Sequence, residues 1–150
     1  MVCEPLGGRR EVLLEESQDR LAWARTVVHL AEKMYPEAKR ITLVQDNLAA
    51  HKPSALYEML TPERARALLR RLEIVPTPKH GSWLYIAELE LSVLSKQSLS
   101  RRIESREELE RIVTRWSARR TAAQKGVDWQ FRTEDARLKL KRLYPSYTPC

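Results

Sequence analysis

Hydrophobic residues recur at helical spacing in several parts of the chain. Between Ser17 and Tyr35 they fall three or four positions apart, the pattern of a helix with one buried face, and Pro36 then ends the pattern. The residues on this face are Trp23, Val27, Leu30 and Met34. The segment is therefore predicted to be an amphipathic helix.

Further helices are predicted downstream. Ser105 and Glu108 have the spacing of a capping box, in which side chains satisfy free backbone N–H groups of the first turn. The apolar positions that follow at i, i+3, i+4 and i+7 are Leu109, Ile112, Val113 and Trp116. Other predicted helices are Pro53–Leu60, a helix capped by Thr61 and begun by Pro62, Leu84–Gln97 with Leu84, Leu91 and Leu94 available for packing, and Thr133 to about Leu143.

Short strands are predicted between the helices. The Gly7-Gly8 pair lies between two short extended runs, which predicts a hairpin near the N-terminus. Residues 41–46, ITLVQD, are largely apolar or β-branched and predict a buried strand whose polar residues emerge at its C-terminal end. Glu73–Pro76 predicts another short strand.

The composition narrows the class of protein. A chain of 150 residues with 43% hydrophobic composition is enough for one globular domain. No apolar run approaches the roughly 18 residues needed to cross a bilayer, and no signal peptide is evident, so we expect a soluble, cytoplasmic protein without membrane contact. Cys3 and Cys150 lie far apart with no residues at zinc-ligand spacing, so neither a zinc site nor a disulfide framework is predicted.

Positive charge is concentrated in the last third of the chain. The net charge is +7, and residues 101–150 hold 13 Lys and Arg against 7 Asp and Glu. This predicts a polyanionic partner such as DNA, although a basic chain can also simply be a soluble one. Arg111, Arg115 and Arg119 form one helical stripe, and with Lys139, Lys141 and Arg142 they are candidate contacts for a DNA backbone. The alternative is a solvated basic face.

Two carboxylates are candidates for chemistry. Asp46 ends a predicted strand, and the C-terminal edge of an open α/β sheet is where ligands bind. Glu88 lies on a helix that follows a loop rich in Pro and Gly. Taken alone, an Asp at this position is more often a turn former or helix cap than a metal ligand, and Glu88 and Glu90 are ordinary solvated helix residues.

The sequence around these carboxylates resembles the DDE transposases, in particular the mariner-like enzymes and related bacterial insertion-sequence transposases. VQDNLAAHKPSALYE resembles their second-aspartate motif, and TPKHGSWLYIAELELSVLSKQ resembles their third-carboxylate motif, with Tyr85 at a position that is usually Asn. The resemblance continues through CEPLGGRREV, MYPEAKRITLV, SRRI and VDWQFRTEDARLKLKRLYP, and so covers nearly the whole chain.

The resemblance implies an α/β, RNase H-like catalytic core over residues 1–100, followed by a basic helical portion over residues 101–150. It implies that Asp46 and Glu88 are catalytic metal ligands, with Glu90 as a substitute, and that Asn47 and His51 line the site. Trp83, in the loop before Glu88, is a further candidate at the site because its ring could stack on a base. A pair of Mg²⁺ or Mn²⁺ ions would serve attack by water, and then by a DNA 3′-hydroxyl, on phosphodiesters. Packing roles remain the alternative for His51 and Trp83, and a structural role is expected for His29.

The resemblance further implies that the family's first catalytic Asp precedes the N-terminal hairpin and is not in this sequence. We therefore expect a nucleoid-associated transposase fragment that does not cleave DNA alone, with an upstream-encoded N-terminal part as a candidate partner. We also expect a homo-oligomer, because residues 41–46 would lack a central neighbouring strand. The alternatives are a non-catalytic DNA-binding or assembly module, or a remnant reading frame.

Overall fold

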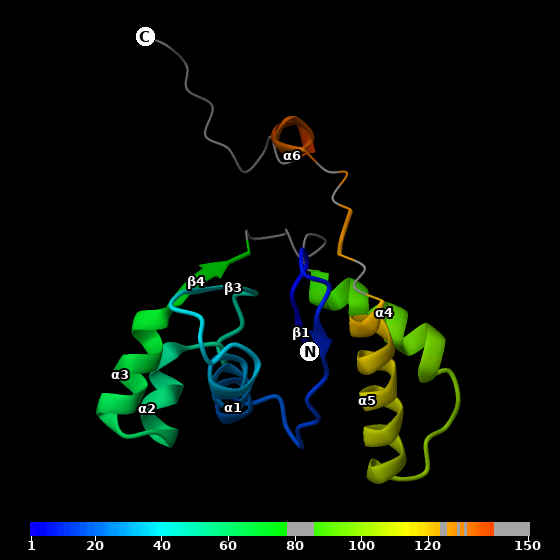
Figure 1. Ribbon diagram of the computed structural model, residues 1–150, viewed down its shortest axis with the longest axis horizontal. Coiled ribbons are helices and arrows are strands. Elements are labelled where there is room, and N and C mark those ends of the chain that lie inside the picture. The colour runs from blue at the N-terminus through cyan, green and yellow to red at the C-terminus, as the bar shows by residue number, and fades with distance from the viewer. Residues whose placement is uncertain (78–85, 124–125, 129, 131, 140–150) are drawn as a thin grey trace.

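A computed structural model describes residues 1–77, 86–123, 126–128, 130 and 132–139. Helices and strands are mixed in an α/β arrangement with two small sheets. We call the N-terminal hairpin with helices α4 (Ile86–Ser98) and α5 (Arg106–Ala122) the hairpin half. The parallel-sheet half consists of helices α1 (Arg20–His29), α2 (Leu56–Met59) and α3 (Pro62–Arg71) with strands β3 (Ile41–Gln45) and β4 (Leu72–Pro76) (Figure 1). No helix within the described ranges is long and apolar enough to span a membrane.

The predicted hairpin is confirmed. Strand β1 (Val2–Cys3) pairs antiparallel with β2 (Arg10–Glu11). The turn between them places Gly8 at a φ of 74°, a left-handed conformation that favours glycine because it has no Cβ. The backbone N–H of Gly8 donates to the carbonyl of Glu4 at 2.9 Å, which closes the turn.

The first predicted helix is also confirmed, with a change at each end. Helix α1 (Arg20–His29) begins after Asp19, whose carboxylate accepts from the N–H of Ala22 at 2.7 Å, and it continues as a π-helical segment, η1 (Leu30–Met34). At the C-terminal end, Arg71 donates to the carbonyls of Ala31, Tyr35, Pro36 and Ala38. The bonds to Ala31 and Tyr35 satisfy carbonyls at the helix terminus, and the bonds to Pro36 and Ala38 hold the chain that follows it.

Strands β3 (Ile41–Gln45) and β4 (Leu72–Pro76) form a parallel pair in the register Ile41 to Leu72 through Gln45 to Pro76. The connection contains a 3₁₀ turn, η2 (Pro53–Ala55), and helices α2 (Leu56–Met59) and α3 (Pro62–Arg71), the last capped by Thr61 as predicted. The buried core of this half consists of Trp23, Ala24, Val27, Ala31, Ala55, Leu56, Ala65 and Leu68.

The prediction of a fully buried strand over residues 41–46 is wrong. Side chains alternate across a strand, and only one face of the β3–β4 sheet packs on the core, through residues such as Ile41, Leu43 and Ile74. On the other face Val44 is 51% exposed, and its cross-strand partner Val75 is 39% exposed. Within the described part of the chain, β3 pairs with β4 alone.

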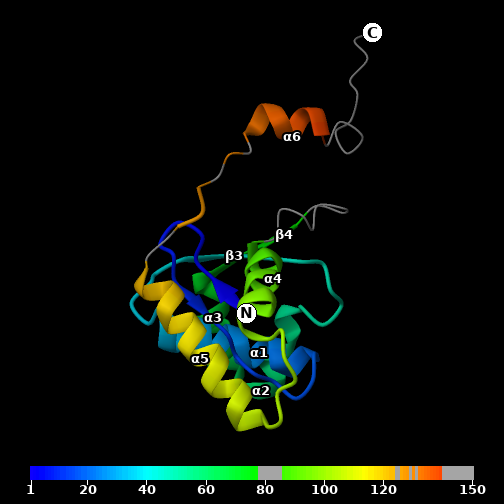
Figure 2. The same ribbon diagram turned by 90° about the vertical axis from the view of Figure 1, so that its right-hand side faces the viewer.

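Helices α4 (Ile86–Ser98) and α5 (Arg106–Ala122) pack beside the hairpin (Figure 2). The cap of α5 is as predicted, because the hydroxyl of Ser105 accepts from the N–H of Glu108 at 3.1 Å. The buried core of this half is small: Leu94, Val113 and Trp116. Leu91, predicted to be available for packing, is instead 43% exposed, and Leu84 lies outside the described residues.

Helix α6 (Thr133–Lys139) stands apart from both halves in the two ribbon views. The prediction extended this helix to about Leu143, and residues 140–150 are not among those described.

The hairpin joins the two halves through polar contacts. Arg9 donates to the carbonyl of Met34 at 2.7 Å, and the hydroxyl of Tyr35 donates to Glu4 at 2.8 Å. His29, expected to be structural, lies 2.6 Å from the carboxylate of Glu11.

Candidate metal centre and nucleic-acid interface

Asp46 directly follows β3, at the C-terminal end of the parallel sheet. Its Oδ1 lies 2.6 Å from Nδ1 of His51 and accepts from the N–H of Leu48 at 3.3 Å. The contact with His51 is a close approach without hydrogen-bond geometry, since Nδ1 of His51 has no aligned partner among the described residues. Both contacts use Oδ1, so the carboxylate is oriented while Oδ2 takes part in neither.

A polar network fixes the loop that carries His51. The side chain of Gln45 is buried; its amide donates to the carbonyl of His51 at 3.0 Å, and its oxygen accepts from Nε1 of Trp23 at 3.0 Å. The His51 and Trp23 rings stack with their centroids 6.2 Å apart. His51 therefore stacks on Trp23 of the core and also contacts Asp46.

Asn47 also lies at this edge of the sheet. Its side-chain amide donates to the carbonyl of Thr77 at 2.8 Å, and the N–H of Thr77 donates to the carbonyl of Gln45 at 2.8 Å. These bonds continue the β3–β4 contact one residue beyond the strands. Gln45 and Thr77 were not predicted from the sequence to belong to this site. Gln45 could have been, because it continues the inward-facing positions of Ile41 and Leu43 on β3, where a polar side chain indicates a buried polar contact.

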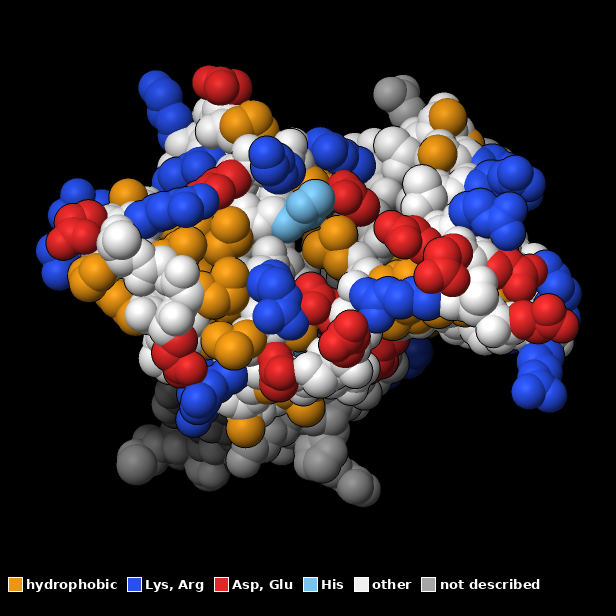
Figure 3. All heavy atoms as spheres, turned by 90° about the horizontal axis from the view of Figure 1, so that it is seen from below, with side chains coloured by type: hydrophobic (Ala, Val, Ile, Leu, Met, Phe, Trp, Pro, Cys, Tyr) orange, Lys and Arg blue, Asp and Glu red, His pale blue; other side chains and the backbone are white. Residues whose placement is uncertain are grey.

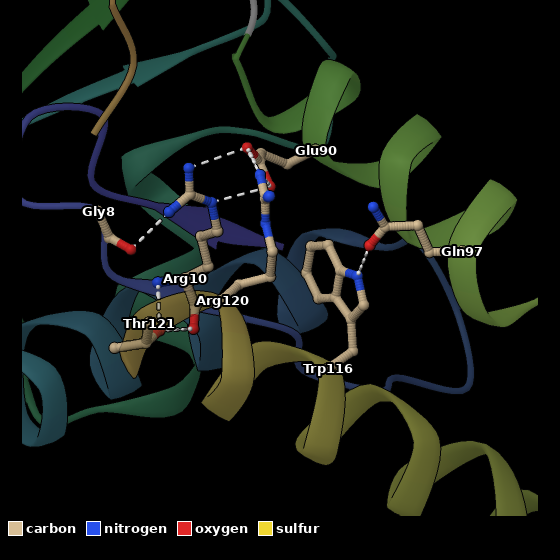
Figure 4. Close-up of polar contacts among 7 residues, drawn as sticks. All are labelled: Gly8, Arg10, Glu90, Gln97, Trp116, Arg120 and Thr121. Carbon is tan, nitrogen blue, oxygen red and sulfur yellow. Dashed lines mark hydrogen bonds and ion pairs between the residues drawn. The ribbon is translucent and has the colours of Figure 1, made fainter. Parts of the chain in front are cut away.

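Glu88 and Glu90 lie in opposite environments on α4. Glu88 is in the first turn, and its side chain is exposed. Glu90 is only 6% exposed and lies between the guanidinium groups of Arg10 and Arg120 (Figure 4). A metal ion at Glu90 would have to displace both arginines. Trp83 lies outside the described residues.

The charge state of Glu90 follows from these neighbours. Burial favours the neutral acid and would raise the pKa of Glu90, but the hydrogen bonds and positive charges of Arg10 and Arg120 outweigh burial, so its pKa lies below the ordinary value. Glu90 is therefore a carboxylate engaged in a buried ion cluster.

Residues 3–110 match the family model of the DDE superfamily endonucleases. The chain belongs to this superfamily. Neither a curated protein nor a solved structure matches it. The matched range includes Asp46, Glu88 and Glu90 and ends within α5, so most of the basic C-terminal third lies beyond the region matched by the family model.

The carboxylate of Asp46 is a suitable donor for a hard cation, because Mg²⁺ and Mn²⁺ prefer carboxylate oxygens. Exposed Glu88 offers a second carboxylate of the same kind. The described residues contain no group of three or more His, Cys, Asp or Glu side chains that could hold a metal ion. They therefore supply suitable donors without completing a coordination shell.

The three arginines of the predicted stripe, Arg111, Arg115 and Arg119, are all exposed on α5. None of them forms a salt bridge with another described residue, whereas the next residue, Arg120, turns inward to Glu90. Lys139 is exposed on α6, and Lys141 and Arg142 lie outside the described residues. On the face of the molecule seen from below, acidic and basic side chains are instead interspersed (Figure 3).

Proposed function

We propose that the chain forms part of a mariner-like DNA transposase, or of a bacterial insertion-sequence relative, with an RNase H-like catalytic domain. Asp46 and Glu88 are its second and third metal-binding carboxylates, and DNA is the substrate. The observation that carries the proposal is the position of Asp46 within the matched region, at the C-terminal end of a parallel strand. The antiparallel hairpin followed by a parallel strand pair also supports an RNase H-like core.

In this proposal the protein's task at Asp46 is to hold one carboxylate in a fixed direction. The N–H of Leu48 and the ring of His51 hold Oδ1, and Trp23 and Gln45 hold His51 in turn. Mg²⁺ or Mn²⁺ would supply charge stabilisation for attack on a phosphodiester. Asp46 and Glu88 are two of the ligands in this proposal, and no group of three His, Cys, Asp or Glu side chains that could hold the ion lies within the described residues.

The affinity for Mn²⁺ tests this proposal, measured by electron paramagnetic resonance. Asp46→Asn and Glu88→Gln each remove one charged donor while keeping the shape of the side chain, and each should weaken Mn²⁺ binding at least tenfold. Glu63→Gln is the matched control, because Glu63 is also an exposed glutamate in the first turn of a helix. Affinities equal to that of the unmodified chain in both variants would contradict the assignment.

We also expect the 150-residue chain alone to show no metal-dependent DNA cleavage, since an incomplete set of catalytic groups loses most of its rate. A nicking assay on supercoiled DNA with Mg²⁺ or Mn²⁺ measures this directly. Nicking by the chain that disappears in Asp46→Ala would show that the site is complete without a further ligand.

A second candidate function, DNA binding without catalysis, is favoured by the exposed arginines of α5. Phosphate contacts release counterions, so binding should fall steeply with salt. Replacing Arg111, Arg115 and Arg119 by Ala should weaken binding to all sequences alike and reduce the slope of log K against log salt by up to about 3. A control variant with Lys33, Arg66 and Arg70 replaced by Ala removes equal charge from exposed positions elsewhere. Equal effects of the two triple variants would mean that only net charge matters.

A further inference from the structure

Helix α4 has apolar residues on two sides, so hydrophobicity alone does not determine which side turns inward. The structure buries Ala87, Glu90 and Leu94, while Leu89 is 52% exposed and Leu91 is 43% exposed. Ala87, Leu91 and Leu94 have equally good helical spacing and would bury a leucine in place of a charge. The observed rotation of α4 about its own axis, its observed setting, is thus not the one that the apolar pattern favours.

The two settings differ by a rotation of the helix. Successive residues are about 100° apart around a helix axis, so replacing Glu90 by Leu91 in the three-residue inward face turns the centre of that face by about a third of this angle, roughly 35°. A side chain at the outer radius of the helix then moves by about 3 Å. Such a movement is large compared with the distance of about 2.1 Å between Mg²⁺ and a ligand oxygen. The rotation of α4 therefore determines whether Glu88 can serve as a ligand.

Polar contacts hold the observed setting (Figure 4). Nη2 of Arg10 donates to Oε1 of Glu90 at 3.0 Å, and its Nε lies 2.8 Å from Oε2. Nη2 of Arg120 lies 2.8 Å from Oε1 and 3.0 Å from Oε2. Two turns further along α4, the side-chain oxygen of Gln97 accepts from Nε1 of Trp116 at 3.0 Å. Two polar contacts thus face α5 on the same side of α4.

Arg10 is itself anchored at several points. Its Nη1 donates to the carbonyl of Gly8 at 2.5 Å, and its backbone N–H donates to the hydroxyl of Thr121 at 3.0 Å. The hydroxyl of Thr121 in turn donates to the carbonyl of Arg10 at 3.2 Å. The carboxylate of Glu90 is therefore held against the hairpin and α5 together, and it cannot leave this position without exposing or unpairing a buried arginine.

We propose that Glu90 is a positioning residue for Glu88: its buried contacts with Arg10 and Arg120 fix the rotation of α4 and so direct Glu88 outward. Residues i and i+2 lie on nearly opposite sides of a helix, so an inward Glu90 requires an outward Glu88. Buried ion clusters can specify one packing arrangement among alternatives of similar stability. The inference rests on the proposed role of Glu88 as a metal ligand.

The test removes the ion cluster without leaving a buried charge unpaired. The variant combines Glu90→Ala, Arg10→Met and Arg120→Met, which leaves Leu91 as the stronger apolar residue. Spin labels at Glu88→Cys and Thr114→Cys, in a background with Cys3 and Cys150 replaced by Ser, report the distance between α4 and α5. We expect one narrow distance in the parent and a distribution that is shifted or broadened by several ångströms in the triple variant. Circular dichroism should show the same helix content in both.

Mn²⁺ affinity, measured in proteins that retain Glu88, gives the second readout. The triple variant should bind Mn²⁺ at least tenfold more weakly while it stays folded. Leu94→Ala is the control, because it loosens the same helix without touching the ion cluster, and its distance and affinity should match those of the parent. A triple variant with the parent's narrow distance would overturn the proposal. If the distance shifts but the parent binds no Mn²⁺, the rotation is confirmed and the metal role of Glu88 is the part that fails.

Discussion

The two halves of the molecule are held together by different kinds of interior. The parallel-sheet half has eight buried apolar residues in one cluster, contributed by α1, η1, η2, α2 and α3. The hairpin half has three, and beside them it buries the charged cluster of Glu90, Arg10 and Arg120. An apolar core tolerates small rotations of its helices, whereas an ion cluster with several hydrogen bonds permits only one arrangement.

The difference matters because each half carries one of the proposed metal ligands. In the parallel-sheet half, Asp46 is directed locally by a loop, through Leu48 and His51. In the hairpin half, Glu88 has no comparable local support among the described contacts, and its direction depends on a helix whose rotation is fixed two residues away. Precise placement of a ligand can therefore come from a loop or from the packing of a whole helix.

The largest expected effect is that of Glu90→Ala. Arg10, whose side chain is 2% exposed, would be left as a buried charge without its main partner, which costs about 3–5 kcal/mol in the free energy of unfolding. Urea denaturation measures the loss, and hydrogen exchange should quicken in α4 and α5 more than in α1 to α3. A change below about 1 kcal/mol would mean that the ion cluster contributes little to the hairpin half.

Leu56→Ala should destabilise the parallel-sheet half more than the hairpin half. Leu56 is fully buried at the centre of the apolar cluster, and removing its side chain leaves a cavity that costs about 2–5 kcal/mol. Exchange should quicken in α1 to α3 while α4 and α5 stay protected at equal denaturant. Uniform quickening over the whole chain would show that the halves unfold as one cooperative unit.

Acid should weaken the hairpin half through Glu90. The folded-state pKa of Glu90 is lowered, so its stabilising contribution is complete above the unfolded-state pKa of about 4.5 and is lost as the pH falls through the lower folded-state value. Glu90→Gln should therefore destabilise the protein at neutral pH and flatten the fall in urea midpoint between about pH 5 and pH 3. Identical pH profiles for the two proteins would contradict the assigned shift. Glu107 and Glu108 also have lowered pKa values, and they are present in both proteins, so their contribution cancels.

The smallest effect on stability is expected at the open face of the β3–β4 sheet. Val44→Lys places a charge at an exposed position, so the free energy of unfolding should change by less than about 0.5 kcal/mol. Self-association, expected for an exposed strand pair with an unpaired edge, should decrease in light scattering. Leu43→Lys, one residue away on the packed face, is the control and should destabilise the protein strongly. Unchanged association in Val44→Lys would exclude this face as the contact.

Local signals in the sequence predicted much of this fold. Asp19, Ser105 and Thr61 cap helices close to the predicted boundaries, and the Gly7-Gly8 pair marks the hairpin turn. These features depend on residues a few positions apart. The burial of Glu90 could not be predicted in this way, because its partner Arg10 is 80 residues distant and the apolar pattern of α4 favours Leu91.

The candidate site also has some features that depend on nearby residues and others that depend on distant ones. Asp46 and His51 are five residues apart, so a motif can hold both, and the structure brings them to 2.6 Å. The contribution of Thr77 to the same edge depends on the pairing of β3 with β4, which no local pattern specifies. The exposure of Val44 likewise follows from which face of the sheet the helices cover.

The most direct measurement compares Glu88→Gln with Glu90→Gln in parallel Mn²⁺ titrations and urea denaturation. We expect Glu88→Gln to lose at least tenfold in Mn²⁺ affinity with a change in unfolding free energy below about 0.5 kcal/mol, since it alters an exposed residue. Glu90→Gln should lose stability, because it breaks a buried charge cluster. If Glu88→Gln keeps the full affinity for Mn²⁺ while the folded protein binds the ion, Glu88 is not a metal ligand and the account of this site is wrong.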